Sequence, residues 1–247
     1  MFAIQTSNLT KQFGGLVVLD HVMVQVPVGQ RRAIIGPNGA GKTTFFNLIF
    51  GQLAPTRGKI SILDQDVAHL SPERRTRLGL RRTYQSSSLF DDLTVLENLT
   101  IGWLGPVGHT HNLLAPWSRD QQAKSCAEAM AVKVGLASKQ QEPAGGLSHG
   151  ERRQLELGMA MIGEPKILLL DEPAAGLSAA ERTTLQTMLG EITQEATVLM
   201  IEHDMNIALT FAEEVTVLAN GVHILTGTPD EVVADSHVQE AYLGGTF

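Results

Sequence analysis

The sequence predicts an α/β protein with a parallel α/β core, an antiparallel β flank and an inserted helical subdomain. Three observations carry this prediction. Short apolar strands alternate with helical segments, β signals fade between about residues 86 and 160, and antiparallel strand patterns occur near both ends. We therefore expect one domain over 1–247, in which 1–85 and 161–247 form the core and 86–160 form the helical subdomain.

The N-terminal part carries strand signals followed by a strand, loop and helix. Valines alternate with other residues over 22–28, which predicts a strand with one buried face, near a sheet edge because of Pro27. Residues 32–35 predict a short apolar strand that leads into a glycine loop. Residues 43–50 then predict a helix that stops at Gly51.

The middle of the chain is predominantly helical. Thr94 and Glu97 are spaced as a capping box at the start of a helix. A loop rich in Gly, Pro and His, 105–117, is expected to interrupt the helices, which resume over 119–136 with strong helix formers.

The α/β pattern returns after residue 165. Strands are expected over 166–172 and 197–203, with helices starting at Ala179 and Asp204. In the segment 214–227, Asn220 and Gly221 separate two apolar runs, which is typical of a two-residue hairpin. Thr228, Pro229 and Glu231 then supply the N-cap, the first-turn proline and the capping partner of a last helix.

Composition excludes some classes of protein. The net charge of −7 and the pI near 5.6 argue against a dedicated nucleic-acid binder. Five arginines within 74–82 form one local exception, which we interpret as a solvated helix face, with phosphate or lipid contact as the alternative.

The lone Cys126 excludes an internal disulfide, fits a reducing compartment and is expected to pack against other residues. No stretch approaches the ~18 apolar residues of a membrane span, and 1–11 lack a secretory signal layout.

The segment GPNGAGKT at 36–43 predicts a phosphate-binding loop. Glycines let the backbone turn tightly and bring N–H groups against phosphate oxygens at the start of a helix. Lys42 would neutralise β/γ-phosphate charge, Thr43 would offer its hydroxyl to Mg²⁺, and Thr44 would bond the α-phosphate. The expected nucleotide-binding residues of the loop are Gly36, Asn38, Gly39, Ala40, Gly41, Lys42, Thr43 and Thr44.

Polar side chains end the two apolar strands that follow residue 165. Asp171 is expected to hold Mg²⁺ through water, while Glu172 polarises the water that attacks the γ-phosphate. Capping of the next helix is the structural alternative for this pair. His203 ends the second strand and is expected to sense the γ-phosphate, whereas His109 and His111 are weak evidence for a metal.

Residues 147–151, LSHGE, resemble the signature motif of ABC ATPases, usually written LSGGQ, and the resemblance covers essentially the whole chain. It implies an ABC ATPase variant of the P-loop NTPase fold. It also implies that two such domains pack head to tail, so that Ser148, Gly150 and Glu151 complete the ATP site of the opposite subunit. His149 and Glu151 replace the usual glycine and glutamine, and both replacements leave the phosphate clamp plausible.

Further residues match family positions one by one. Phe13 in KQFGG resembles the aromatic that stacks on adenine, with core packing as its alternative. Gln85 in RRTYQ resembles the glutamine that contacts Mg²⁺ and the attacking water. AAGLS at 174–178 resembles the loop that crosses the dimer interface, with Ser178 where many relatives have Asp.

Within the superfamily, several segments are most similar to the ATPase subunits of branched-chain or hydrophobic amino-acid importers. They are KQFGGLVVLDHV, RRTYQSSSLFDDLTVLENL, DEPAAGLS, IEHDM and the ending AYLGG. This resemblance implies ATP and Mg²⁺ as cofactors and a second ATPase subunit, identical or related, as partner. It also implies transmembrane permease subunits, an indirect link to a substrate-binding protein, and a peripheral position on the cytoplasmic face of the inner membrane. Residues 86–90 and Leu93 are expected to line or support the groove for the permease, with ordinary core as the alternative.

Other functions remain open at this stage. The same pattern occurs in urea and short-amide importers, and exporters of lipids share the ATPase core. A soluble ABC ATPase that acts on nucleic acid is disfavoured because no coiled-coil insertion, zinc module or second cassette is visible. A regulatory module without hydrolysis is disfavoured by the intact set of Lys42, Asp171, Glu172 and His203.

Overall fold

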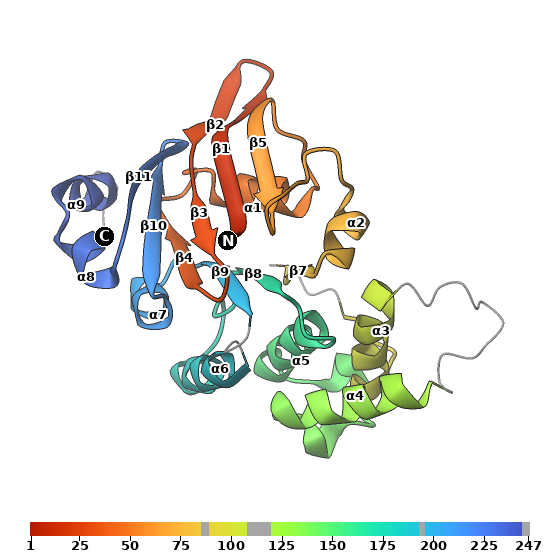
Figure 1. Cartoon of the computed structure of the whole chain (residues 1–247). Coiled ribbons are helices and arrows are strands. Elements are labelled where there is room, and N and C mark those ends of the chain that lie inside the picture. Colours follow the sequence, from red (N-terminus) through yellow and green to blue (C-terminus); the bar gives the residue numbers. More distant parts are fainter. Residues whose placement is uncertain (85–88, 108–119, 193–195, 244–247) are drawn as a thin grey trace.

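The computed structural model describes residues 1–84, 89–107, 120–192 and 196–243. Within these ranges the chain forms two β-sheets with helices around them, and Figure 1 shows α3, α4 and α5 gathered on the side away from β1, β2 and β5. The predicted α/β class, with an antiparallel flank and helical elements, is therefore confirmed.

The first sheet is antiparallel. Its strands run in the order β2-β1-β5-β6, and β3 pairs with β1. Their bounds are β1 Phe2–Phe13, β2 Leu16–Val22, β3 Gln25–Pro27, β5 Arg57–Ile62 and β6 Gln65–Asp66. The prediction of one strand through 22–28 is wrong, because the chain divides between β2 and β3. Val28 is 52% exposed, since Gly29 (φ 83°) turns the chain toward the second sheet.

The second sheet has six strands in the order β11-β10-β4-β9-β8-β7, all parallel except β11. Their bounds are β4 Arg31–Ile35, β7 Leu80–Arg82, β8 Ile167–Asp171, β9 Thr197–Ile201, β10 Glu214–Ala219 and β11 Val222–Gly227. The predicted hairpin is confirmed between β10 and β11, where Asn220 (φ 49°) and Gly221 (φ 79°) supply the two left-handed turn residues.

The helices begin and end largely where their caps predict. The α-helices are α1 Lys42–Phe50, α2 Pro72–Arg77, α3 Val95–Val107, α4 Gln121–Lys133, α5 His149–Met161, α6 Ala179–Ile192, α7 Met205–Phe211, α8 Pro229–Ala234 and α9 Ser236–Leu243. Gly51 ends α1 in the left-handed conformation, and the capping boxes of Thr94 and Thr228 are confirmed. The loop expected to interrupt the helices from residue 105 does not begin there, because α3 continues to Val107. Residues 108–117 of the expected loop lie outside the described residues.

The parallel sheet buries both faces. In β8, Ile167 and Leu169 pack with α1 and the antiparallel sheet, whereas Leu168 and Leu170 pack with the helices on the opposite side. This is the pattern expected for a parallel strand covered on both faces, and it explains the continuous apolar run of the sequence. Cys126 packs against the core cluster of the helical side, as predicted.

The arginine-rich segment is not a solvated face throughout. Arg75 is 1% exposed and donates to the carbonyl oxygens of Leu48 (2.6 Å), Ile49 (2.7 Å) and Val67 (2.7 Å). The guanidinium thereby satisfies carbonyls in the last turn of α1, which have no partner inside the helix. Burial lowers the pKa of Arg75 to about 10. The interpretation as a solvated face is wrong for this residue.

Asn98 organises the start of the helical region, and its removal is expected to destabilise the protein. Its fully buried side chain donates to the carbonyl oxygens of Phe90, Leu93 and Thr94 and accepts from the Phe90 N–H. We expect Asn98→Ala to lower the free energy of unfolding by about 2–3 kcal/mol, because the Phe90 N–H loses its acceptor and three carbonyl oxygens each lose one donor without gaining water. The exposed helical Asn206 is the matched control, and Asn206→Ala should stay within about 0.5 kcal/mol in the same denaturant titration. Equal stability of the two variants would contradict the prediction.

Candidate functional site

The phosphate-binding loop joins the carboxyl end of β4 to α1. Gly36, Gly39 and Gly41 have φ of 152°, 81° and 95°. A β-carbon on Gly36 would lie 2.0 Å from the Leu218 carbonyl oxygen, and one on Gly41 would lie 2.6 Å from Leu19 Cδ2. Backbone conformation and close packing both therefore require glycine at these two positions.

Lys42 begins α1 and is buried within the loop. Its Nζ donates to the carbonyl oxygens of Gly36 (2.5 Å) and Pro37 (3.1 Å), and the residue is 6% exposed. Burial lowers the pKa of Lys42, while the negative charges of Glu172 and Asp171 act in the opposite direction. The loop thus holds a cation at the N-terminus of α1, which suits a phosphate ligand, with two carboxylates nearby.

Asp171 ends β8 in a buried ion pair. Arg82 Nη2 lies 2.7 Å from Asp171 Oδ2, and both side chains are less than 5% exposed. Arg82 also donates to Asn47 Oδ1 (2.6 Å) and Gln52 Oε1 (3.0 Å), so it links β7 and β8 to α1 and the residues after it. The interpretation of the arginine-rich segment as a solvated face is wrong for Arg82 as well, because its partners come from distant parts of the chain.

Glu172 and His203 meet at the same edge of the sheet. His203 Nε2 lies 2.8 Å from Glu172 Oε1, and the side chains are 46% and 14% exposed respectively. Glu172 adopts φ 48°, a conformation that non-glycine residues adopt rarely. The structure therefore brings the two predicted residues together with Lys42, although the roles assigned to them remain predictions.

Glu202 is a candidate residue that sequence reasoning missed. It is 4% exposed, and its carboxylate accepts from the N–H groups of Ala174 (2.9 Å) and His203 (3.1 Å). Burial raises the pKa of Glu202, and the nearby Glu172 adds to the rise. Its sequence signal was a carboxylate at the end of the apolar strand, directly before His203.

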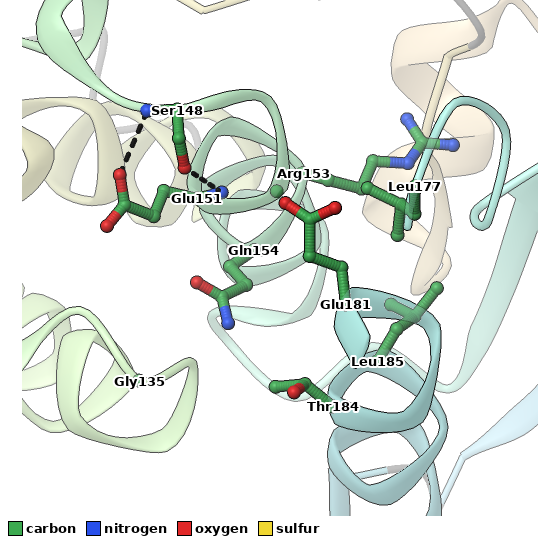
Figure 2. Close-up of a pocket in the computed structure, with 10 residues that line it drawn as sticks. Gly135, Ser148, Glu151, Arg153, Gln154, Leu177, Glu181, Thr184 and Leu185 are labelled. Atoms are coloured by element: carbon green, nitrogen blue, oxygen red, sulfur yellow. Dashed lines mark hydrogen bonds between the residues drawn. The ribbon is translucent and has the colours of Figure 1, made fainter. Parts of the chain in front are cut away.

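The signature segment forms the N-terminus of α5. Ser148 is the N-cap, Glu151 closes the capping box, and Lys139 Nζ lies 2.9 Å from Glu151 Oε1. Ser148, Gly150 and Glu151 line a cavity of about 350 Å³ together with Glu181 and other residues of α6 (Figure 2). None of the described residues that line this cavity belongs to the phosphate loop, so the predicted nucleotide-binding residues fall into two groups.

Arg153 connects these two groups within one chain. From the second turn of α5 it donates to the carbonyl oxygens of Asp171 (2.9 Å), Glu172 (2.8 Å) and Pro173 (2.9 Å). It also donates to the Tyr84 carbonyl oxygen (3.1 Å), directly before the predicted Gln85. The signature helix is therefore fixed to the backbone that carries the two carboxylates. Sequence reasoning missed this residue, because its partners lie far away in the chain.

Three of the remaining predicted residues are wholly or partly exposed, and three others lie outside the described residues. Phe13 ends β1, is 46% exposed and has Lys11 Nζ 4.7 Å from its ring centroid. Thr43 is exposed and Thr44 half-buried. Gln85, His109 and His111 lie outside the described residues.

Two searches of the described residues bear on ligands and membranes. No group of three or more His, Cys, Asp or Glu side chains in the described ranges is arranged to hold a metal ion. Among the helices of the described segments, none is long and apolar enough to cross a membrane.

Comparison with known proteins gives consistent results over nearly the whole chain. The family model described as ABC transporter matches residues 19–175, and that described as branched-chain amino acid ATP-binding cassette transporter matches 223–247. The high-affinity branched-chain amino acid transport ATP-binding protein BraF of Pseudomonas aeruginosa is 36% identical, over 98% of this chain and 97% of its own. The corresponding LivG of Escherichia coli K12 is 34% identical with the same coverage.

Solved structures agree with these relatives. An ATP-binding cassette of an ABC transporter in its ADP conformation superposes with a TM-score of 0.88 at 30% identity, covering 99% of both chains. A nucleotide-free ATP-binding cassette superposes with a TM-score of 0.87 at 29% identity, covering 98% of this chain and 99% of the other.

Proposed function

Because this chain belongs to the ABC transporter family of ATP-binding proteins, we propose that it powers an importer of branched-chain or other hydrophobic amino acids. The observation that carries the ATP-driven part of the proposal is the convergence of a buried Lys42 with Asp171, Glu172 and His203 at the carboxyl ends of three parallel strands. The relatives at 34–36% identity are named as branched-chain amino acid transport proteins, which supports this cargo.

ATP is the nucleotide that we propose for the phosphate loop. The N–H groups of Gly36 and of residues 38–44 and the Lys42 ammonium would hold the phosphates, and Phe13 would stack on the base. Glu172 would take a proton from the attacking water, and His203, which contacts Glu172, would orient that carboxylate and contact the γ-phosphate. Gln85 would contact the same water.

Mg²⁺ is the metal that the donor set fits. Thr43 is exposed and carries a hydroxyl, Gln85 carries an amide, and Asp171 carries a carboxylate that would act through water because it is buried against Arg82. Hard oxygen donors of this kind suit Mg²⁺. The described residues contain no carboxylate cluster that would hold a metal alone. This fits an ion that arrives with nucleotide phosphates, since Mg²⁺ commonly uses one or two carboxylates together with the phosphates. When bound, the ion would neutralise charge that develops on the β/γ-phosphates.

A second ATP-binding subunit would complete each site. Ser148, Gly150 and Glu151 lie at the N-terminus of α5, where N–H donors and the helix dipole favour an anion, and they line a cavity without phosphate-loop residues. We propose that this N-terminus meets the γ-phosphate held by a partner, identical or related, in a head-to-tail dimer. ATP would then hold the two subunits together, and hydrolysis would release them.

The permease would dock where the helical region meets the core. A cavity of about 280 Å³ there is lined by Arg81, Tyr84, Leu89, Met159 and others. Leu89 also packs against the core, whereas Phe90 is 48% exposed, and Ser86 to Ser88 lie outside the described residues. We propose that residues 86–160 act as the helical subdomain that transmits motion to the permease, on the cytoplasmic face of the membrane.

Purification of the tagged chain from its native cells tests the proposal. We expect permease subunits and a second ATP-binding subunit to copurify, and the reconstituted complex with its binding protein to import leucine only when ATP is enclosed. Urea or amide uptake, or ATP-driven lipid release, would replace the proposed cargo by one of its alternatives. Salt-sensitive nucleic-acid binding without permease subunits would contradict a transport function.

A further inference from the structure

Glu181 lies between the N-termini of two helices. Its Oε2 accepts from the Ser178 N–H (2.8 Å) and the Ser178 hydroxyl (2.7 Å), which caps α6. Its Oε1 faces the other helix, because a β-carbon placed on Gly150 would lie 2.3 Å from it. Hydrogen bonds from the Ser178 hydroxyl and the Ser178 N–H lower the pKa of Glu181. The carboxylate is thus held in its charged form at the start of α5.

Figure 2 shows the same arrangement from the side of the cavity. The Glu181 side chain extends from α6 toward the first turn of α5, where Ser148 and Glu151 form their capping box. The cavity of about 350 Å³ is lined by Glu181, Ser148 and Glu151, and also by Gly150. An anion that approached the donors of α5 through this cavity would therefore meet the carboxylate of Glu181.

Helix capping explains only one oxygen of Glu181. Glu151 and Glu231 cap α5 and α8 in the same way, each with one oxygen on the N-cap residue. The second oxygen of Glu151 pairs with Lys139, a cation. That of Glu181 instead lies beside Gly150 on a different helix, a position that α6 does not require for its own cap.

The consequence rests on the proposed function, in which Gly150 serves the γ-phosphate of a partner's ATP. A carboxylate beside Gly150 and a phosphate at the same helix N-terminus repel each other, since both are anions at close separation. We propose that Glu181 is an internal competitor of this phosphate. Its carboxylate occupies the clamp in the separated subunit, and the dimer closes only when the partner's nucleotide displaces it.

His149 contacts the loop before α6. Its Nε2 lies 3.4 Å from the Ala175 carbonyl oxygen and 2.9 Å from the position of a β-carbon on Gly176. The usual glycine of the motif would leave this space empty. Because Glu181 also holds Ser178, its displacement changes the contacts of the loop that is expected to cross the dimer interface. Nucleotide arrival at the clamp is thereby transmitted to that loop.

Substitution of Glu181 in the complete transporter complex tests this competition. Glu181→Gln keeps an oxygen for the Ser178 N–H but removes the charge, and Glu181→Asp keeps the charge but shortens its reach toward Gly150. We expect both variants to lower the KM for ATP hydrolysis by about three- to tenfold, because the repulsion between the carboxylate and the incoming phosphate is removed or weakened. Glu231→Gln is the matched control, since it alters the same capping box at α8, and it should leave the KM unchanged.

Two results would overturn the proposed competition, and a third would separate its failure from failure of the proposed function. A KM in both Glu181 variants equal to that of Glu231→Gln, with melting temperatures that also match, would overturn the competition. A raised KM would show that Glu181 assists closure and would overturn it equally. Failure of the proposed function would look different, because a Lys42→Ala complex would then hydrolyse ATP at the wild-type rate, whatever the KM of the Glu181 variants.

Discussion

Replacing Glu172 by Gln is expected to lower the maximal rate of ATP hydrolysis by the assembled complex about 10²- to 10⁴-fold. The amide has nearly the same shape as the carboxylate but cannot accept the proton of the attacking water. Its oxygen can still contact His203 Nε2, which lies 2.8 Å from Glu172 Oε1 in the wild type. ATP binding should therefore persist while turnover is lost.

Phosphate release and equilibrium binding of ATP measure the two effects separately. Glu164→Gln is a close control, because Glu164 is also a glutamate with positive φ (54° against 48° for Glu172), but it is exposed and precedes β8 instead of following it. We expect this control to retain wild-type turnover. Unchanged turnover in Glu172→Gln would remove Glu172 from the role of general base, and loss of ATP binding would indicate a structural defect instead.

The backbone at Glu172 supports its placement at a site of chemistry. A non-glycine residue with positive φ is strained, and such residues persist where the surrounding structure holds them. Here the Glu172 N–H donates to the Ile201 carbonyl oxygen (2.9 Å) and Arg153 donates to the Glu172 carbonyl oxygen (2.8 Å). The side chain is therefore aimed by two neighbouring elements of the fold, β9 and α5, in addition to its own loop.

Features that depend on nearby residues could be predicted from the sequence. The hairpin at Asn220, the capping boxes at Thr94 and Thr228 and the helix stop at Gly51 each follow from the chemistry of a few adjacent positions. The phosphate loop is of the same kind, since its glycines and Lys42 act within one turn of chain. The hairpin, the capping boxes and the helix stop were correct because no distant partner decides them, whereas phosphate binding by the loop stays a prediction.

Features that depend on distant partners could not be predicted. Arg75 and Arg82 look like members of a solvated charged helix in the sequence, yet the first caps α1 and the second pairs with Asp171, 89 residues away. The long β1 was also missed, because its polar Thr, Ser, Lys and Gln residues hide the alternation that marks a strand. A guanidinium can be buried only where carbonyls or carboxylates converge on it, and the fold alone determines such places.

The same reasoning makes Arg153 the position where a single substitution should cost most stability. Its guanidinium donates to Glu156 (2.6 Å) and to four backbone carbonyls, and the residue is 7% exposed. Arg153→Met keeps the apolar stem but leaves these acceptors without their donor. We expect the free energy of unfolding to fall by about 3–5 kcal/mol, because loss of one partner strands a buried charge. Thermal melting should show a decrease of about 10 °C.

Arg152→Met separates this effect from a general loss of charge on α5. Arg152 pairs with Asp91, which is 61% exposed, and donates to the Ala144 carbonyl oxygen (3.0 Å), so its contribution should be smaller, at about 1–2 kcal/mol. If Arg153 joins the signature helix to the backbone of Asp171 and Glu172, its loss should also impair turnover in variants kept folded by lower temperature. The N-terminus of α5 would then no longer be held in register with the carboxylates of its own chain. Full turnover in folded Arg153→Met would show that the arginine serves stability alone, and equal melting temperatures of the two variants would contradict the predicted burial effect.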